Sequence, residues 1–339
     1  MQSLNQIMSD YYANIDVKNI SLLKNKVVLI TGASGLIGSN IIAYLDYQNK
    51  KYHLNLKIIG IIRSTKELWF SRGKNIQYLK LNLAFQRLPK KMKFDYLIHC
   101  ATYAQPKKFL QRPKETVLLN IATLFDLLDL AKKNHARFLY LSSAEIYGQA
   151  DKEHIPTDES FPGLVNTLSD RAIYAESKRL AETICYTYLK IVDVKIARVL
   201  ICYGPGVKYD DQRVISEFIK KAQNLKEIIM MDQGSALRTF IFISDAIEIL
   251  LNILLNSKEI VYNVCGKESA SIRGLAEKIA LINSAKVSGQ YSSQEISGTP
   301  KQSTLSNKKY LDEFKKRSFV RLEDGLKITS DWFKNIKNQ

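Results

Sequence analysis

The sequence predicts an α/β protein in which a doubly wound parallel sheet carries a smaller C-terminal lobe. Short apolar runs typical of buried strands alternate with segments of helical periodicity as far as Tyr147, and this order forms a parallel sheet covered by helices on both faces. A glycine-rich turn joins the first run to the first helix, and beyond Tyr203 the elements become shorter. We therefore expect a sheet domain at residues 25–202, with returning segments near 239–265, and mostly the lobe at 203–339.

The composition narrows the class of protein. With 46% hydrophobic and 24% charged residues in a chain of 339, this is ordinary globular material that can bury a large core. The formal net charge of +17 comes from lysines spread along the chain, so we expect no specific nucleic-acid partner. The four cysteines are scattered without paired spacing, which favours a reducing compartment and no metal site.

Residues 1–24 are expected to form an N-terminal arm with one or two short helical pieces. This segment is polar and lacks the basic start and apolar centre of a signal peptide. No stretch of the sequence is apolar for long enough to span a membrane. We therefore expect a cytoplasmic protein without a membrane partner.

The strand at residues 26–30 leads through residues 31–38 into a helical pattern at 41–47. Three glycines spaced three residues apart in this turn let a dinucleotide pyrophosphate approach the backbone amides at the helix N-terminus. The pattern is that of a Rossmann-type fold, so we expect a dinucleotide cofactor. The residues of the turn expected to bind it are Gly32, Ser34, Gly35, Leu36, Ile37 and Gly38.

The second strand, at residues 56–62, ends in Arg63 and Ser64, where an acidic residue normally holds the adenosine ribose. A guanidinium there suits the 2′-phosphate of NADP, whereas an arginine stacked on adenine is compatible with NAD, and both cofactors stay open. His99 is favoured as a packed strand residue. Further cofactor contacts are expected from residues that follow the next strands, namely Asn82 and Leu83 near the adenine and Ala101 on the nicotinamide side.

A proton-transfer set follows the apolar strand at residues 138–141. Ser143 and Glu145 come at its carboxyl end, where an open parallel sheet presents its chemistry. Tyr174 and Lys178 lie one turn apart on a helix, and an ammonium beside a phenol lowers the phenol's pKa. The set can take a proton from an alcohol while a hydride leaves its carbon. The alternative is a surface tyrosine above a solvated lysine.

Four stretches carry a family resemblance: residues 99–120, 171–183, 211–219 and 238–245. The second of them follows the pattern Arg-Ala-x-Tyr-x-Glu-x-Lys-Arg. On these motifs the sequence resembles the extended short-chain dehydrogenases/reductases of the NAD-dependent epimerase/dehydratase group, and within them the UDP-glucuronate decarboxylases. The likeness runs from about residue 26 to about residue 265.

The resemblance implies a nucleotide-sugar enzyme that oxidises C4 of a nucleotide-linked hexuronate and releases carbon dioxide. Its NAD or NADP would be tightly bound and recycled, with Tyr174 and Lys178 also touching it. The lobe would bind a nucleotide-diphosphate sugar, and the chain would form a homodimer that serves polysaccharide precursor synthesis. The implied catalytic residues are Ser143, Glu145, Tyr174 and Lys178, and the implied substrate-binding residues are Tyr103, Arg213 and Arg238.

The sequence departs from the family pattern at several positions. Ala144 stands where related 4,6-dehydratases carry the aspartic acid that protonates the departing hydroxyl, which disfavours dehydration. Ile201 replaces an asparagine that contacts the substrate, and residues 303–306 replace an arginine motif that helps to hold the diphosphate. A 4-epimerase and a 4,6-dehydratase with a different acid are the alternative enzymes, and a catalytically silent dinucleotide-binding module is the alternative of another class.

Overall fold

A seven-stranded parallel sheet forms the centre of the computed structural model, which describes residues 4–64, 69, 71–289 and 302–337. The strand order is β10-β6-β5-β4-β1-β2-β3, so the chain proceeds outward from β1 on one side and from β4 on the other. Ligands of such sheets bind beyond the carboxyl ends of the two strands where the order reverses. The strands are β1 (Val27–Thr31), β2 (Lys57–Ile62), β3 (Ile76–Lys80), β4 (Tyr96–His99), β5 (Arg137–Ser143), β6 (Val194–Val199) and β10 (Val261–Val264).

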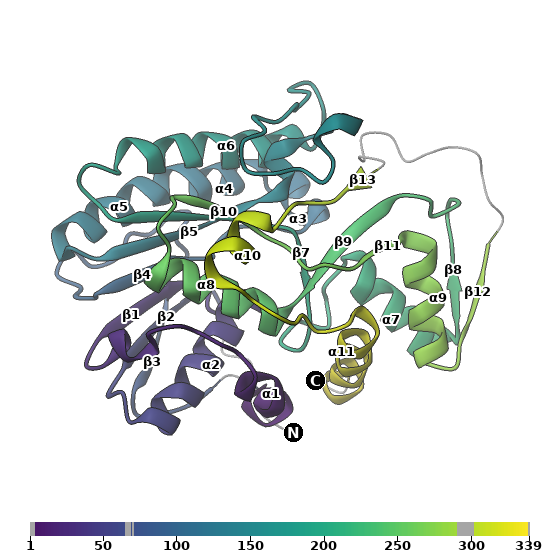
Figure 1. Ribbon diagram of the computed structural model, residues 1–339, viewed down its shortest axis with the longest axis horizontal. Coiled ribbons are helices and arrows are strands. Elements are labelled where there is room, and N and C mark those ends of the chain that lie inside the picture. The colour runs from purple at the N-terminus through teal and green to yellow at the C-terminus, as the bar shows by residue number, and fades with distance from the viewer. Residues whose placement is uncertain (1–3, 65–68, 70, 290–301, 338–339) are drawn as a thin grey trace.

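Helices cover both faces of this sheet (Figure 1). Side chains of β5 alternate between the two cores, because Phe138 and Tyr140 pack under one layer of helices and Leu139 and Leu141 under the other. The first layer comprises α4 (Pro113–Val117), the π-helical turn η2 (Leu118–Ala122), α5 (Thr123–Asn134) and α6 (Ala172–Thr187). The second comprises α2 (Leu36–Tyr52) and α8 (Ile243–Asn256).

Asn120 is a buried polar residue within the first layer of helices. α4, η2 and α5 follow one another without a break, so Asn120 lies inside a helical stretch that starts at Pro113. Pro113 occupies the first turn, where its missing N–H costs no hydrogen bond. The short helix α3 (Pro106–Gln111) precedes it. Asn120 is fully buried and donates to the hydroxyl of Ser177 on α6 at 2.9 Å, which explains a polar residue at this position.

The N-terminal arm packs on its own chain. Helix α1 (Leu4–Ala13) buries Leu4, Met8 and Tyr12 in the core that it shares with α2. The hydroxyl of Tyr12 donates to Asn40 Oδ1 at 3.0 Å. A 3₁₀ turn, η1 (Ile20–Leu23), then leads into β1. The first three residues of the expected arm lie outside the described residues.

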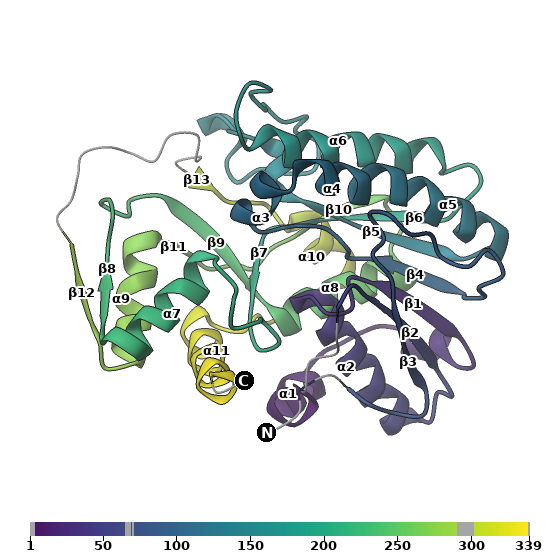
Figure 2. The same cartoon turned by 180° about the vertical axis from the view of Figure 1, so that it is seen from behind.

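The C-terminal lobe has a sheet of its own, beside the carboxyl edge of the central sheet (Figures 1 and 2). Strand β9 pairs with β7 and β13 in parallel and with β11 antiparallel, while β8 pairs with β12. The central sheet receives β10 and the covering helix α8 from this part of the chain. The strands are β7 (Ile201–Tyr203), β8 (Glu227–Ile229), β9 (Leu237–Phe242), β11 (Ser269–Ser271), β12 (Lys286–Ser288) and β13 (Gln302–Ser303). The helices are α7 (Val214–Leu225), α9 (Ile272–Ile282), α10 (Lys308–Phe314) and α11 (Leu322–Ile336).

Two further 3₁₀ turns lie near the carboxyl edge of the central sheet. One, η3 (Ala144–Tyr147), follows β5 directly and carries Glu145, and the other is η4 (Lys152–His154). Among the described helices, none is both long and apolar enough to cross a membrane.

Candidate functional site

The glycine turn between β1 and α2 allows its backbone segments to approach one another closely. Gly32 has a φ of +66°, and a Cβ there would lie 2.8 Å from the backbone nitrogen of Ala101. A Cβ at Gly38 would lie 2.5 Å from the carbonyl oxygen of Gly32. Both contacts are shorter than side chains tolerate, so this turn requires glycine at both positions.

A cleft of about 1130 Å³ opens above this turn, between the central sheet and the lobe. Every site residue expected from the sequence lines it, except Lys178. The structure therefore brings together residues that are up to about 200 positions apart in the chain, from the glycine turn to Arg238. The expected residues in its lining are Gly32, Ser34, Gly35, Leu36, Ile37, Gly38, Arg63, Asn82, Leu83, Ala101, Tyr103, Ser143, Glu145, Tyr174, Arg213 and Arg238.

These features fit a dinucleotide. Helix α2 begins at Leu36 after Gly35, and no side chain caps its N-terminus, so the amides of the first turn face the cleft side without a side-chain acceptor. Uncapped amides at a helix N-terminus attract a phosphate. The glycines leave room for it beside the backbone. Among the described residues, no group of three or more His, Cys, Asp or Glu side chains is placed to hold a metal ion.

Arg63 reaches across the cofactor end of the cleft. Its Nη1 donates a hydrogen bond to the hydroxyl of Tyr103, and its guanidinium carbon lies 5.2 Å from the centre of that ring. Arg112 lies over the same ring at 5.8 Å. Arg63, expected to bind the cofactor, therefore contacts Tyr103, expected to bind the substrate. The two residues are 40 positions apart in the sequence, which did not predict this contact.

Tyr174 lines the cleft and is buried, with 4% of its surface exposed. Its ring stacks on Phe109 of α3, with centroids 4.8 Å apart and planes at 8°. Burial raises the pKa of the phenol, a hydrogen bond with Ser143 lowers it, and Glu145 raises it further. Burial outweighs the stabilising contacts, so the pKa of this phenol lies above its usual value and the expectation of a lowered pKa is wrong.

Lys178 lies beneath Tyr174, one helical turn along α6, and is also buried. Its Nζ donates to the carbonyl of Leu141 at 2.6 Å and lies 4.5 Å from the centre of the Tyr140 ring. Burial lowers the pKa of Lys178 to about 7, although Cys185 and Glu182 act in the opposite direction. The solvated lysine of the alternative interpretation is therefore excluded.

This burial predicts a pH-dependent stability. The folded protein holds the Lys178 proton less tightly than the unfolded chain, whose lysine has the ordinary pKa of 10.5, so the folded state binds fewer protons between about pH 7 and 10.5. The contribution to unfolding free energy therefore rises with pH, by about 2 kcal/mol between pH 7 and 9. Urea denaturation should show this rise in wild type relative to Lys178→Met. A constant difference between the two proteins would contradict it.

Ser143 and Glu145 are held by the turn that follows β5. Ser143 Oγ accepts a hydrogen bond from the backbone N–H of Glu145 at 3.2 Å, which caps η3 and directs both side chains to the cleft. The carboxylate of Glu145 accepts from Arg171 Nη2 at 2.6 Å. Arg171 was missed as a site residue, although it opens the Arg-Ala-x-Tyr motif and lies three positions before Tyr174.

The two expected substrate arginines are bound to the protein in different ways. Arg213 donates from Nε and Nη2 to the carboxylate of Asp211, at 3.0 and 2.9 Å for Oδ2, so its forked donors face that carboxylate in the structure. Asp211 is buried and also accepts from Gln105 at 2.8 Å. Arg238 is 7% exposed, and its Nη1 donates to the carbonyl of Leu237 at 2.7 Å.

His99 is a buried strand residue, as the sequence favoured. Its Nδ1 shares a 2.7 Å hydrogen bond with the hydroxyl of Thr31. Burial, with the neighbouring Lys178, lowers the pKa of the imidazole to about 3, so it is neutral in the folded protein.

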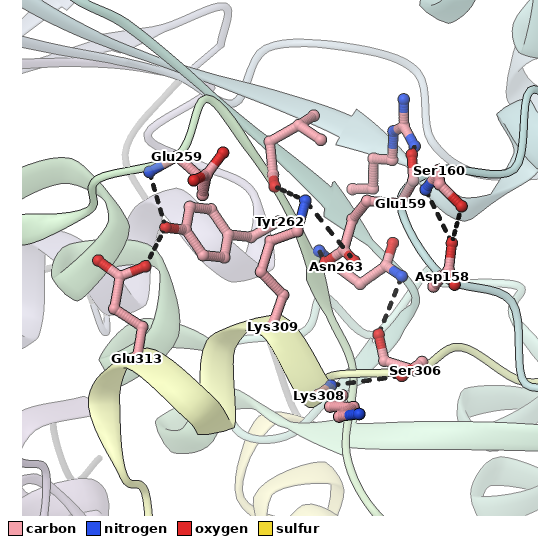
Figure 3. Close-up of polar contacts among 12 residues, drawn as sticks. Asp158, Glu159, Ser160, Glu259, Tyr262, Asn263, Ser306, Lys308, Lys309 and Glu313 are labelled. Atoms are coloured by element: carbon pink, nitrogen blue, oxygen red, sulfur yellow. Dashed lines mark hydrogen bonds and ion pairs between the residues drawn. The ribbon is translucent and has the colours of Figure 1, made fainter.

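A buried polar network connects η3 with the segment after β13, and Figure 3 shows the part of it in which Asn263 contacts Ser306. Asn263 on β10 is fully buried, and its Oδ1 accepts from the hydroxyl of Tyr147 at 2.7 Å. Its Nδ2 donates at 3.0 Å to the carbonyl of Thr157 and at 3.0 Å to the carbonyl of Ser306. Ser306 lies in the segment that follows β13. Arg198 donates to the Tyr147 hydroxyl at 2.9 Å. One asparagine therefore links η3 to the end of β13, which reaches the cleft at Ser303.

Tyr147→Phe should lower the free energy of unfolding by about 1–2 kcal/mol, because it leaves the buried Asn263 carbonyl and the Arg198 guanidinium each short of a partner. The matched control is Tyr186→Phe on α6, whose side chain is 68% exposed and should change stability by less than about 0.5 kcal/mol. Equal effects of the two substitutions in urea denaturation would contradict the importance of the network.

Comparison with known proteins identifies relatives over most of the chain. Residues 28–265 match the NAD dependent epimerase/dehydratase family. UDP-glucuronic acid decarboxylase 1 of Danio rerio is 28% identical over 319 residues, which cover 94% of this chain and 75% of the zebrafish protein.

Solved structures share the fold. The UDP-N-acetylglucosamine 4-epimerase of Methanobrevibacter ruminantium M1 superposes with a TM-score of 0.80 at 24% identity, over 92% of this chain and 99% of its own. The UDP-glucuronic acid 4-epimerase of Bacillus cereus gives 0.77 at 24% identity, over 91% and 99%. These two likenesses establish the architecture alone.

Proposed function

This chain belongs to the NAD dependent epimerase/dehydratase family and is an NAD-dependent enzyme of nucleotide-sugar modification, and from that premise we propose that it oxidises C4 of a nucleotide-linked hexuronate and removes C6 as carbon dioxide. The observation that carries the proposal is the meeting of Tyr174 and Ser143 in the cleft that also contains the glycine turn. The name of the zebrafish relative supports the choice of a hexuronate.

Ala144 supports decarboxylation over dehydration. It lies in the cleft lining beside Glu145, and its methyl group cannot protonate a departing hydroxyl. Loss of carbon dioxide from a carboxylate β to a ketone needs no acid at that position.

The proposed mechanism assigns a proton or a charge to each side chain. Oxidised nicotinamide supplies the hydride acceptor. Tyr174 takes the proton of the C4 hydroxyl, with Ser143 hydrogen-bonded to it. The C4 ketone then accepts the electron pair that the C6 carboxylate leaves behind, and Ser143 stabilises the resulting enolate oxygen. Glu145 would relay a solvent proton to C5, and Tyr174 would return its proton to the C4 oxygen when the ketone is reduced, which would give a pentose nucleotide.

The cofactor would be held by the glycine turn from Gly32 to Gly38, with Arg63 and Asn82 on the adenosine side and Ala101 on the nicotinamide side. Lys178, which lies beneath Tyr174, would stabilise the negative charge of the phenolate. Arg213 is paired with Asp211. It would bind the diphosphate either by releasing Asp211 or through Nη1, which donates to the carbonyl of Cys202 at 3.4 Å.

Arg63, in place of an acidic residue that would repel a 2′-phosphate, predicts that the cleft binds NADP as well as NAD. Arg63→Asp should weaken NADP binding by about tenfold and leave NAD binding within about threefold, because an added carboxylate repels only the phosphorylated ribose. Calorimetric titration of both dinucleotides into wild type and variant measures this. A parallel loss for the two cofactors would show that Arg63 acts on the shared part of the molecule.

Incubation with UDP-glucuronate tests the proposed reaction. We expect carbon dioxide to be released together with a UDP-pentose, with one carbon dioxide for each sugar consumed. Inversion at C4 without carbon dioxide would instead assign a 4-epimerase, and tight dinucleotide binding without any conversion of nucleotide sugars would assign a binding module.

A further inference from the structure

The end of the cleft next to Tyr174 holds two guanidinium groups and one carboxylate in close proximity. Arg171, Arg238 and Glu145 all line the cleft there. The structure pairs Glu145 with Arg171 at 2.6 Å. Burial lowers the pKa of Arg238, with Glu145 raising it and Arg171 lowering it, so the three charges influence one another. Two guanidinium groups and one carboxylate give this group a formal net charge of +1.

The pair between Arg171 and Glu145 uses part of the guanidinium. Only Nη2 of Arg171 contacts the carboxylate in the described structure, while Nε is buried and has no hydrogen-bond partner there. A guanidinium binds a carboxylate best through two parallel N–H groups. Because the buried Nε has no hydrogen-bond partner, a reorientation of Arg171 that presents two N–H donors to a carboxylate in the cleft would satisfy it.

The stacked rings beside this pair fix its position relative to the reacting alcohol. The guanidinium carbon of Arg171 lies 5.7 Å from the centre of the Phe109 ring, and Phe109 stacks on Tyr174 at 4.8 Å. Arg171 is the N-cap residue of α6, three positions before Tyr174. An anion held by Arg171 would thus lie near the carbon whose hydroxyl meets Tyr174.

We propose that Arg171 is a specificity-determining residue that binds the C6 carboxylate of the hexuronate, and that Glu145 limits how tightly Arg171 holds it. The inference rests on the proposed function for its substrate class. A neutral hexose leaves the excess positive charge uncompensated, whereas a hexuronate neutralises it, so the site selects the acid.

The limit set by Glu145 has a physical purpose in a decarboxylase. A bidentate clamp on the carboxylate stabilises the substrate more than a transition state in which the departing group becomes neutral carbon dioxide. Glu145 competes with the substrate carboxylate for the Arg171 guanidinium. The substrate carboxylate is therefore attracted strongly enough to be selected, but less strongly than by an arginine that pairs with it alone. Arg171 and Glu145 thus have opposite effects on the affinity for the acid.

The test measures binding in a Tyr174→Phe background, where turnover does not interfere. Calorimetry with UDP-glucuronate and UDP-glucose compares this parent with added Arg171→Gln, Arg171→Lys or Glu145→Gln. We expect Arg171→Gln to raise the Kd for UDP-glucuronate by about tenfold and to leave that for UDP-glucose within about twofold. Arg171→Lys should recover part of the selectivity that Arg171→Gln loses, because lysine keeps the positive charge but lacks the forked N–H donors. Glu145→Gln should lower the Kd for UDP-glucuronate by about threefold or more.

Arg273→Gln, on α9 outside the cleft lining, makes the same change of charge and is the matched control. Equal weakening of both sugars by Arg171→Gln would overturn the inference while leaving the proposed function intact. If Arg171→Gln weakens the binding of UDP-glucuronate alone, but the wild-type protein releases no carbon dioxide, decarboxylation is refuted and the inference stands. A parent that binds neither sugar would overturn both.

Discussion

Tyr174→Phe should reduce turnover of UDP-glucuronate by about 10²–10⁴-fold while leaving dinucleotide affinity within about twofold. The substitution removes one hydroxyl from a side chain that is 4% exposed and stacked on Phe109, so the ring keeps its packing. The acceptor for the C4 hydroxyl proton is lost, and Ser143 loses its hydrogen bond with Tyr174. Steady-state carbon dioxide release and calorimetric titration of NAD measure the two effects.

Tyr186→Phe on the same helix is the control, since its exposed side chain lies outside the cleft lining. It should keep turnover within about twofold of wild type. Retention of activity by Tyr174→Phe would remove the phenol from the mechanism. Loss of both activity and cofactor affinity would instead mean that the hydroxyl supports the shape of the site.

Gly38→Ala should abolish measurable dinucleotide binding, an effect of about a hundredfold or more in Kd, and should destabilise the fold by about 1–3 kcal/mol. The added methyl group would lie 2.5 Å from the carbonyl oxygen of Gly32, and it would therefore force the turn and the start of α2 apart. The amides expected to meet the pyrophosphate belong to this segment. Calorimetry with NAD and urea denaturation measure the change.

Gly274→Ala is the matched control, because Gly274 lies in the first turn of α9, where the nearest atom to an added Cβ is the Ser271 hydroxyl at 3.2 Å. It should leave cofactor binding unchanged. Unaltered NAD affinity in Gly38→Ala would mean that the dinucleotide does not lie on this turn.

Local sequence patterns were sufficient for the central sheet and for the outline of the cleft. The apolar run at residues 138–141 lies within β5, and the periodic segment at 171–188 contains α6, because burial on one or both faces imposes these periods on neighbouring residues. The glycine spacing predicted room for a pyrophosphate beside the backbone, and the structure shows that Gly32 also lies too close to Ala101 to carry a side chain. The carboxyl ends of parallel strands lie at one edge of an open sheet. This is why site residues that follow different strands line the same cleft.

Contacts between distant segments could not be predicted in the same way. Asp211 occupies the forked donors of Arg213, and Glu145 occupies Arg171, because partner choice depends on how loops fold over the cleft. The raised pKa of Tyr174 follows from burial under Phe109, a residue that the sequence did not single out. Asn263 joins β10, η3 and the segment after β13 through hydrogen bonds that span up to 116 positions.

Transfer of the hydrogen from C4 tests the central claim most directly. UDP-glucuronate that carries deuterium at C4 should yield a product that keeps the deuterium at C4, or reduced nicotinamide that has gained it, since a hydride moves between carbon centres without meeting solvent. Mass spectrometry of both species follows its fate. Appearance of the deuterium in water, with protium at C4 of the product, would contradict the account.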